Sequence, residues 1–252
     1  MILSKIYDWA IHKKIQKQKV LAVLLDPDKI EWENMPKIIQ LFQENKPDIL
    51  LVGGSLLTNN QLEECVSFLK KNIDLPILLF PSSFSHLSQQ ADGVLFLSLI
   101  SGRNADYLIG NHVLAAPLLK QMSLEILPTG YMLIDCGQTT TAAYMSGTFP
   151  MPYHKDDIAV CTALAGEMLG LKILYLDGGS GADKPVSESM IQKVQKNTTI
   201  PLIVGGGIRN PQQLQKAYQA GADWVVIGTI IEQNPQILKE MIEIRNAFLD
   251  KN

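Results

Sequence analysis

Short runs of apolar residues alternate with amphipathic segments along almost the whole chain, and most runs stop abruptly at Asp, Gly, Ser or Pro. Within a run nearly every position is apolar, which is typical of strands in a parallel sheet that helices cover on both faces. The predicted strands comprise residues 20–25, 48–52, 77–80, 93–97, 124–126 continued by 131–134, 173–176, 201–204 and 224–227. A Pro-Thr-Gly stretch at 128–130 is expected to interrupt the fifth strand.

Apolar residues at helical spacing predict a helix between most neighbouring strands. Residues 3–18, ahead of the first strand, carry a loose helical pattern. The other predicted helices comprise residues 32–44, 60–71, 84–90, 105–120, 156–170, 187–196, 211–221 and 235–248, and Pro117 is expected to interrupt the fourth of these. The polar stretch 135–154 is too long for an ordinary connection, so we expect a functional loop there.

Eight strand–helix units in 252 residues match the size of a (β/α)8 TIM barrel. The prediction is therefore an α/β fold with a single barrel domain over residues 1–252 and an N-terminal helix before the first strand. A doubly wound open sheet is the alternative. It is disfavoured because no GxGxxG motif follows the first strand, which ends in Asp26-Pro27-Asp28, and these acids would repel a pyrophosphate.

The composition, 46% hydrophobic and 19% charged, fits a folded chain with a sizeable core. The net charge of −3 argues against a nucleic-acid partner. Cys65, Cys136 and Cys161 lack CxxC spacing and are expected to be reduced thiols of a cytoplasmic protein. Neither a signal peptide nor an apolar stretch of membrane-spanning length is visible, so no stable membrane anchor is expected.

The carboxyl ends of all strands in a barrel meet at one face, where active sites lie. The sixth strand ends in Asp177 and the glycine-rich segment 178–181, whose backbone amides can approach an anion closely. Glycines also follow the seventh strand, at 205–207, and the eighth, at Gly228-Thr229. Any one of these could simply permit a tight turn, but together they predict a phosphate site, because loops seven and eight are the usual phosphate cradle of this fold.

Two hard oxygen ligands follow the first two strands. Asp26 supplies a carboxylate and Ser55 a hydroxyl, a pair that suits Mg²⁺, which completes its shell with water and substrate phosphates. Asp26 could instead serve only as a turn residue in Asp-Pro-Asp. Lys29 could pair with a phosphate or simply be solvated.

Taken together, these strand ends resemble the geranylgeranylglyceryl phosphate synthase family, which includes the bacterial heptaprenylglyceryl phosphate synthases. The motifs that carry the resemblance are Leu25-Asp-Pro-Asp-Lys29, Val52-Gly-Gly-Ser55, Pro128-Thr-Gly-Tyr131, Tyr175-Leu-Asp-Gly-Gly-Ser-Gly181, Val204-Gly-Gly-Gly-Ile-Arg209 and Gly221-Ala-Asp223 with Gly228-Thr229. They run over nearly the whole chain in unchanged order, so the resemblance is specific.

The resemblance implies a Mg²⁺-dependent prenyltransferase of ether-lipid synthesis. Such an enzyme joins the 3-hydroxyl of sn-glycerol 1-phosphate to a prenyl diphosphate, here expected to be geranylgeranyl diphosphate, and releases diphosphate. By position, Asp26 and Ser55 would hold Mg²⁺, and Asp177 would take the hydroxyl proton or only hydrogen-bond the substrate. The implied glycerol phosphate site comprises Tyr175, Leu176, Asp177, Gly178, Gly179, Ser180, Gly181, Gly206, Gly207, Gly228 and Thr229. A homo-oligomer, dimer or larger, is also implied.

Two departures from the family pattern and two alternative functions bear on this prediction. Many family members have Glu-Ala in place of Asp177-Gly178. Many also have an Asn-Pro-x-Trp pattern where this chain has Asn104-Ala-Asp-Tyr107, so Tyr107 either affects the prenyl length that is accepted or is simply an aromatic residue on a helix face. A phosphosugar isomerase could use Asp26 and Asp177 as paired acids, and a non-catalytic phospholigand sensor would need only the glycines. A Schiff-base aldolase is disfavoured because no apolar run contains a lysine.

Overall fold

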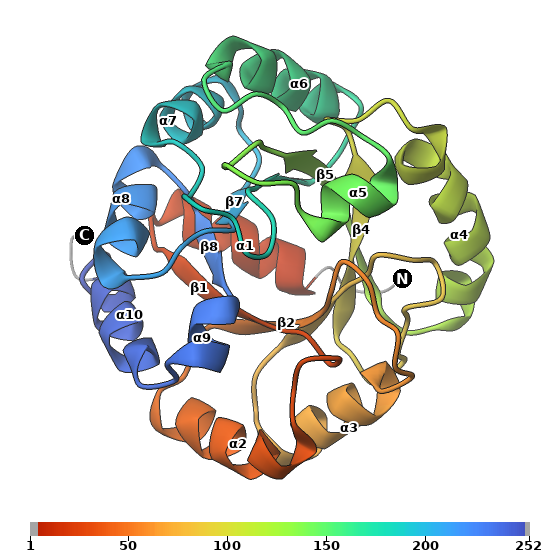
Figure 1. Cartoon of the computed structure of the whole chain (residues 1–252), viewed down its shortest axis with the longest axis vertical. Helices are drawn as coiled ribbons and strands as arrows, with labels where there is room; N and C mark the ends of the chain where they lie inside the picture. The colour runs from red at the N-terminus through yellow and green to blue at the C-terminus, as the bar shows by residue number, and fades with distance from the viewer. Residues whose placement is uncertain (1–4, 250–252) are drawn as a thin grey trace.

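Eight parallel strands close into a barrel in sequence order (Figure 1), as the hydrophobic pattern predicts. The structure is a computed structural model and describes residues 5–249. The strands are β1 (Val20–Leu25), β2 (Ile49–Gly53), β3 (Ile77–Phe80), β4 (Gly93–Leu99), β5 (Glu125–Leu133), β6 (Ile173–Asp177), β7 (Leu202–Gly205) and β8 (Trp224–Ile227). Pairing of Ala22 with Val226 closes the ring between β1 and β8. The predicted (β/α)8 fold is confirmed.

Long helices surround the barrel. They are α2 (Met35–Glu44), α3 (Leu62–Asn72), α4 (Asn111–Gln121), α6 (Asp156–Met168), α7 (Glu188–Asn197), α8 (Pro211–Ala220) and α10 (Ile237–Asn246). Two of them begin with a side-chain N-cap: Ser187 accepts a hydrogen bond from the Met190 amide and Asn210 from the Gln213 amide. The predicted positions of these helices are confirmed to within a few residues, except that α4 begins at Asn111 and not at residue 105.

Side chains alternate along each strand between the barrel interior and the helices. On β6, Tyr175 belongs to the interior cluster, whereas Leu174 and Leu176 pack toward the helices. On β4, Leu95 faces inward and Val94 outward. The interior column therefore continues, two residues at a time, into the polar residues at the strand ends.

Two of the predicted interruptions are wrong. β5 is one strand, because Pro128 keeps its place in the sheet: its carbonyl oxygen accepts a hydrogen bond from the Lys172 amide at 2.8 Å. Pro117 lies inside α4, which runs on to Gln121. Pro117 is exposed and so is Val113, whose carbonyl loses its helical donor and can be hydrated instead. A π-helical turn, η2 (Asp106–Gly110), precedes α4.

The predicted helix 84–90 between β3 and β4 is also wrong: the segment is a series of turns. Serine side chains hold these turns locally. Ser82 Oγ lies 3.2 Å from His86 Nδ1, and Ser88 Oγ accepts from the Gln90 amide. Such local bonds compete with helix formation.

Two short helices lie where none was predicted. α5 (Thr141–Ser146) forms within the polar stretch 135–154, with Thr140 as its N-cap, and α9 (Thr229–Gln233) follows β8 directly. Both lie at the same end of the barrel as the carboxyl ends of the strands (Figure 1). The predicted functional loop therefore carries a helix of its own.

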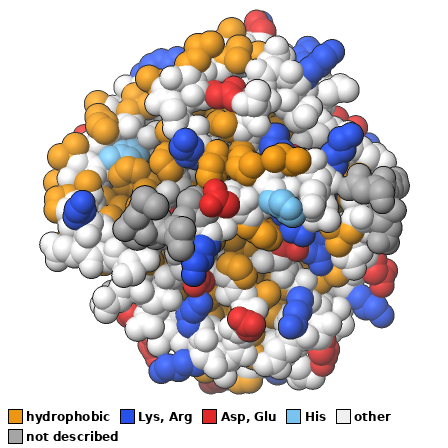
Figure 2. Space-filling model, turned by 180° about the vertical axis from the view of Figure 1, so that it is seen from behind, with side chains coloured by type: hydrophobic (Ala, Val, Ile, Leu, Met, Phe, Trp, Pro, Cys, Tyr) orange, Lys and Arg blue, Asp and Glu red, His pale blue; other side chains and the backbone are white. Residues whose placement is uncertain are grey.

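Helix α1 (Lys5–Ile15) closes the other end of the barrel; residues 3 and 4 of the predicted N-terminal helix lie outside the described residues. Ile6 and Ala10 join the interior cluster, and the rings of Trp9 and Trp224 meet edge to face at 5.6 Å. The carboxylate of Glu125, at the start of β5, accepts the amides of Ile6 at 2.7 Å and Tyr7 at 2.8 Å. Figure 2 shows this end, with hydrophobic side chains among scattered charges.

Across residues 5–249, every helix is too short or too polar to cross a membrane.

Glu125→Ala should lower the free energy of unfolding by about 3 kcal/mol, because it leaves two amides at the start of α1 without their charged acceptor. Urea unfolding followed by circular dichroism measures this. Glu63→Ala, an exposed acid in the first turn of α3, is the control and should stay within about 0.5 kcal/mol of the wild type. Equal stability of both variants would contradict the bonding described for Glu125.

Candidate active site

Two pockets adjoin at the carboxyl ends of the strands. A polar central pocket opens over the barrel interior, and an apolar pocket lies beside it, against β3, β4 and α4. Gly54, Ser55 and Phe80 line both pockets and so form the wall between them. A molecule with a polar and an apolar part could occupy both pockets at once.

The central pocket brings together most of the residues singled out from the sequence. Those that line it are Asp26, Ser55, Tyr175, Asp177, Gly179, Ser180, Gly181, Gly206, Gly207, Gly228 and Thr229. Leu176 does not, because alternation turns its side chain toward the helices, where it is fully buried. Gly178 does not either, since it packs against Cys136, whose sulfur would lie 3.0 Å from an added Cβ.

Asp177 is buried at the floor of this pocket and is held by two hydrogen bonds. The hydroxyl of Tyr131 donates to Oδ2 at 2.6 Å, and the amide of Gly179 donates to Oδ1 at 2.7 Å. Burial raises the pKa of Asp177 above its ordinary value, although both hydrogen bonds act to lower it. A carboxylate with a raised pKa is a better proton acceptor than a solvated aspartate.

The loops after β6 and β7 touch each other across the pocket. Gly206 has φ +78°, and an added Cβ would lie 2.6 Å from the Gly179 amide nitrogen and 2.8 Å from Asp177 Oδ1. Only glycine fits this conformation and this approach. The Gly178 amide is already used, since it donates to the Gly205 carbonyl at 3.0 Å. An anion here would therefore meet Gly206, Gly207 and the start of α9 at Thr229.

Asp26 and Lys29 face each other at the opposite rim. Lys29 Nζ lies 3.3 Å from Asp26 Oδ2 and 3.4 Å from Ser180 Oγ, so it reaches across the pocket mouth. The Asp28 amide donates to Asp26 Oδ1 at 3.1 Å and orients the carboxylate. Gly54 leaves it room, because an added Cβ would lie 2.9 Å from Asp26 Oδ2.

Asp28 has a different role from Asp26. Its Oδ2 accepts the Thr58 hydroxyl at 2.9 Å and its carboxylate also accepts the Asn59 amide, so it ties the loop after β1 to the loop after β2. Burial acts to raise the pKa of Asp28, but these bonds together outweigh it and lower the pKa below its ordinary value. Asp28 therefore fixes the loop that follows Ser55.

The residues fit a magnesium ion better than a transition metal. Among the described residues, no group of three or more His, Cys, Asp or Glu is arranged to hold a metal. Asp26 and Ser55 offer hard oxygen atoms at neighbouring strand ends. The carboxylate of Asp26 is already paired with a positive charge, the ammonium group of Lys29. Mg²⁺ needs few protein ligands and takes the rest from water and phosphate.

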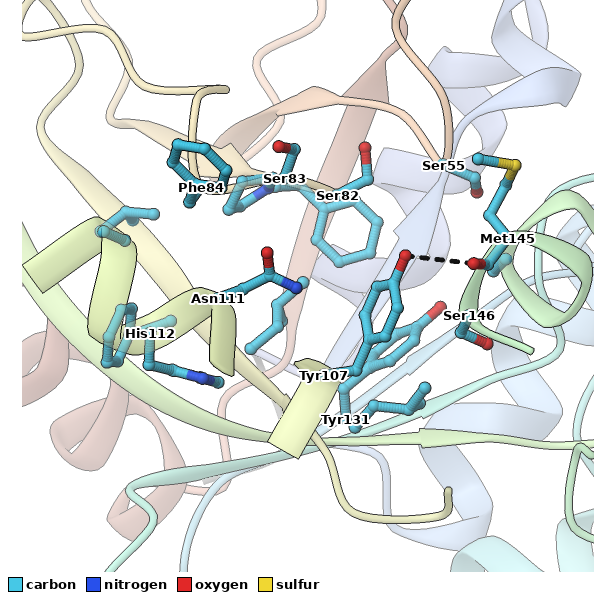
Figure 3. Close-up of a pocket in the computed structure, with 18 of the residues that line it drawn as sticks. Ser55, Ser82, Ser83, Phe84, Tyr107, Asn111, His112, Tyr131, Met145 and Ser146 are labelled. Carbon is cyan, nitrogen blue, oxygen red and sulfur yellow. Dashed lines mark hydrogen bonds between the residues drawn. The ribbon is translucent and has the colours of Figure 1, made fainter. Parts of the chain in front are cut away.

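The apolar pocket lies beside the segment between β3 and β4, which forms turns and no helix. Its walls include Phe84, Leu87, Val94, Phe96, Ala115 and Leu119. Tyr107 from η2 also projects into it, and its hydroxyl donates to the Met145 carbonyl on α5 at 3.2 Å (Figure 3). Tyr107 thus ties the wall formed by η2 to the predicted functional loop 135–154.

Three aromatic rings meet beneath the junction of the two pockets. Phe80 and Tyr175 stack at 5.5 Å, and Tyr131 meets both edge to face, at 5.9 Å from Phe80 and 5.5 Å from Tyr175. Tyr131 lines the apolar pocket while its hydroxyl holds Asp177, which lines the central one. Sequence reasoning missed Phe80 and Tyr131 as site residues. The signals that could have found them were the Pro-Thr-Gly-Tyr131 motif and the interior register of each strand.

An eight-stranded barrel whose mouth holds a polar pocket and an adjoining apolar pocket is a TIM-barrel enzyme suited to an amphiphilic substrate. Comparison with known proteins is more specific: the PcrB family model matches residues 13–245. The chain belongs to the PcrB family.

Individual relatives of the chain carry the name of a prenyltransferase. The geranylgeranylglyceryl phosphate synthase of Spirosoma linguale is 49% identical, covering 93% of this chain and 94% of the relative. That of Pyrococcus furiosus is 41% identical, covering 88% of each. A solved structure of the Thermoplasma acidophilum (S)-3-O-geranylgeranylglyceryl phosphate synthase, in complex with its substrate sn-glycerol-1-phosphate, superposes with a TM-score of 0.89 at 29% identity, covering 98% of this chain and 99% of that one. The prediction of a prenyltransferase is confirmed.

Asp177→Asn should raise the free energy of unfolding at pH 8 by roughly 1 kcal/mol, because it removes a buried charge at a functional site. The sign follows from the raised pKa of Asp177: above that pKa the native state carries the ionised, desolvated carboxylate. The gain should shrink as the pH falls through the raised pKa and vanish below the ordinary value, where both states are protonated. Urea midpoints from pH 8 to pH 4 test this, and a less stable variant at pH 8 would contradict it.

Proposed function

We propose that the protein transfers a geranylgeranyl group from its diphosphate to the 3-hydroxyl of sn-glycerol 1-phosphate, with Mg²⁺, and releases diphosphate. One observation carries the proposal: a polar and an apolar pocket share a wall that contains Ser55, with Asp26 beside it and Asp177 below. The names of the relatives and the sn-glycerol-1-phosphate bound to the Thermoplasma enzyme support the choice of substrates.

Glycerol phosphate would lie in the central pocket. Its phosphate would face Gly206, Gly207 and Gly228, where the backbone can approach closely, and the start of α9 at Thr229. Its glycerol part would then reach toward Asp177, which lines the same pocket. Lys29 and Arg209, both exposed at the rim, add positive charge for two anionic substrates.

The prenyl group would lie in the apolar pocket, and the diphosphate at the wall shared with the central pocket. Phe80 forms part of this wall, and the apolar pocket extends from Phe80 to Ala115 and Leu119 on α4. Burial of a hydrocarbon chain against such side chains is favourable by about 25 cal/mol per Å². The reactive end of the prenyl group would thus lie above the rings of Phe80 and Tyr131.

Asp26 and Ser55 would hold Mg²⁺, which when bound neutralises the charge that develops on the leaving diphosphate. Lys29 is paired with Asp26 in the structure and would turn toward a phosphate instead. The Asp28 amide keeps Asp26 oriented in either case.

The reaction balances without a further reactant. The glycerol 3-hydroxyl oxygen attacks C1 of the prenyl group, the bond from C1 to the diphosphate oxygen breaks, and its electron pair leaves with the diphosphate. The hydroxyl proton passes to the carboxylate of Asp177, whose raised pKa favours acceptance. A small phosphosugar, the substrate of the isomerase alternative, would leave the apolar pocket without a use.

Homo-oligomerisation and a cytoplasmic location stay predictions.

Asp26→Ala should lower turnover at least a hundredfold while binding of sn-glycerol 1-phosphate changes little, because Asp26 lies on the diphosphate side of the pocket. Formation of lipid-extractable ether from labelled sn-glycerol 1-phosphate and prenyl diphosphates of several lengths measures turnover, and calorimetry measures binding. Chelation of Mg²⁺ should abolish turnover of the wild type. The absence of ether product at every prenyl length would overturn the proposed function, and normal turnover of Asp26→Ala would remove the metal assignment.

Ala115→Trp should shorten the prenyl chain that the enzyme accepts, because Ala115 is buried in the wall of the apolar pocket. The kcat/KM for the longest accepted diphosphate should fall at least tenfold relative to a ten-carbon one. Ala116→Trp is the matched control, since Ala116 is the next residue on α4 and is exposed. Equal chain-length profiles for the two variants would contradict a prenyl group in this pocket.

A further inference from the structure

We infer that Tyr131 is the positioning residue of the reaction: its hydroxyl holds the carboxylate of Asp177 toward the point where the two pockets meet. This inference rests on the proposed function, in which Asp177 accepts the glycerol proton. It assigns a role to a strand residue that otherwise resembles ordinary core.

The first observation is the hydrogen bond itself. Tyr131 Oη lies 2.6 Å from Asp177 Oδ2, and both side chains are buried. Burial holds the pKa of Tyr131 well above its ordinary value, so its hydroxyl stays protonated and donates. With the Gly179 amide on Oδ1, each carboxylate oxygen receives one donor and keeps a lone pair free for a substrate proton.

The second observation is the place of Tyr131 between the pockets. Its ring lines the apolar pocket, where Figure 3 shows it with Tyr107, whereas its hydroxyl reaches the acid of the central pocket. Edge contacts with Phe80 and Tyr175 fix the ring. One rigid side chain therefore contacts the proposed prenyl site and orients the proposed proton acceptor.

A purely structural role predicts something different. In that case loss of the hydroxyl would lower the free energy of unfolding and leave the plateau value of kcat unchanged. If Tyr131 acts through Asp177, loss of the donor must weaken the ionised form of that carboxylate, so the acidic limb of the kcat profile must move to higher pH. The other titratable and charged groups around Asp177 are the same in the wild type and in a Tyr131 variant, so their effects on the pKa of Asp177 cancel when the two are compared. These groups are Tyr175 on β6, Cys136 after β5, and Asp26, Lys29, Arg209 and Glu232 at the pocket rim.

The test compares pH profiles of kcat for the wild type and Tyr131→Phe at saturating Mg²⁺ and substrates. Tyr131→Phe keeps the ring, and we expect kcat to fall about tenfold or more with the acidic limb moved upward. Tyr218→Phe is the control: it removes another buried hydroxyl, which donates to the Val20 carbonyl on β1, and should leave both kcat and the limb unchanged.

A second probe covers the case in which Tyr131→Phe folds poorly. Replacement of Tyr131 by 3-fluorotyrosine keeps the hydroxyl and makes it a stronger donor, so the acidic limb should move to lower pH. If the acidic limb of the kcat profile stays where it is in whichever of these two variants folds, the inference is overturned and the proposed function still stands. Failure of the wild type to form any ether product would overturn both.

Discussion

The alternation of side chains along eight parallel strands is the constraint on which both the core and the candidate site depend. In a closed barrel, residues two apart on a strand share a face, so the interior column continues directly into the mouth. On β6 the column is Ile173, Tyr175 and Asp177, of which the first two pack in the interior cluster and the last lines the central pocket. The site is therefore the top layer of the same column that forms the core.

The layer below supplies the electrostatics of the site. Phe80, Tyr131 and Tyr175 cover the barrel interior with their rings, and this packing removes Asp177 from water. The raised pKa of Asp177 is thus a consequence of core packing, and the hydrogen bonds from Tyr131 and Gly179 limit the rise. The protein retains a buried carboxylate that destabilises the native state near neutral pH, a cost that is common where function requires a proton acceptor.

The sequence predicts the strands well, because short runs that are apolar at every position and end in turn residues are typical of buried parallel strands. It predicts the short helices α5 and α9 poorly, since isolated helices of that length depend on caps such as Thr140 and on tertiary contacts. Polar residues at strand ends, such as Asp26, Ser55 and Asp177, are conspicuous in sequence. Aromatic residues within strands are not: Tyr131 looks like core until its hydroxyl is seen to meet Asp177.

The helix wrongly expected at residues 84–90 is the difference with the largest functional consequence. In a barrel of this kind a helix after β3 would cover the outer face of the neighbouring strands. Turns replace it, and the outward-facing Val94 and Phe96 of β4 become walls of the apolar pocket together with the inward-facing Phe80. The pocket therefore connects the outside of the barrel with its interior mouth. The proposed prenyl group requires such a passage, because its chain must lie against apolar side chains while its diphosphate reaches Ser55 and Asp26.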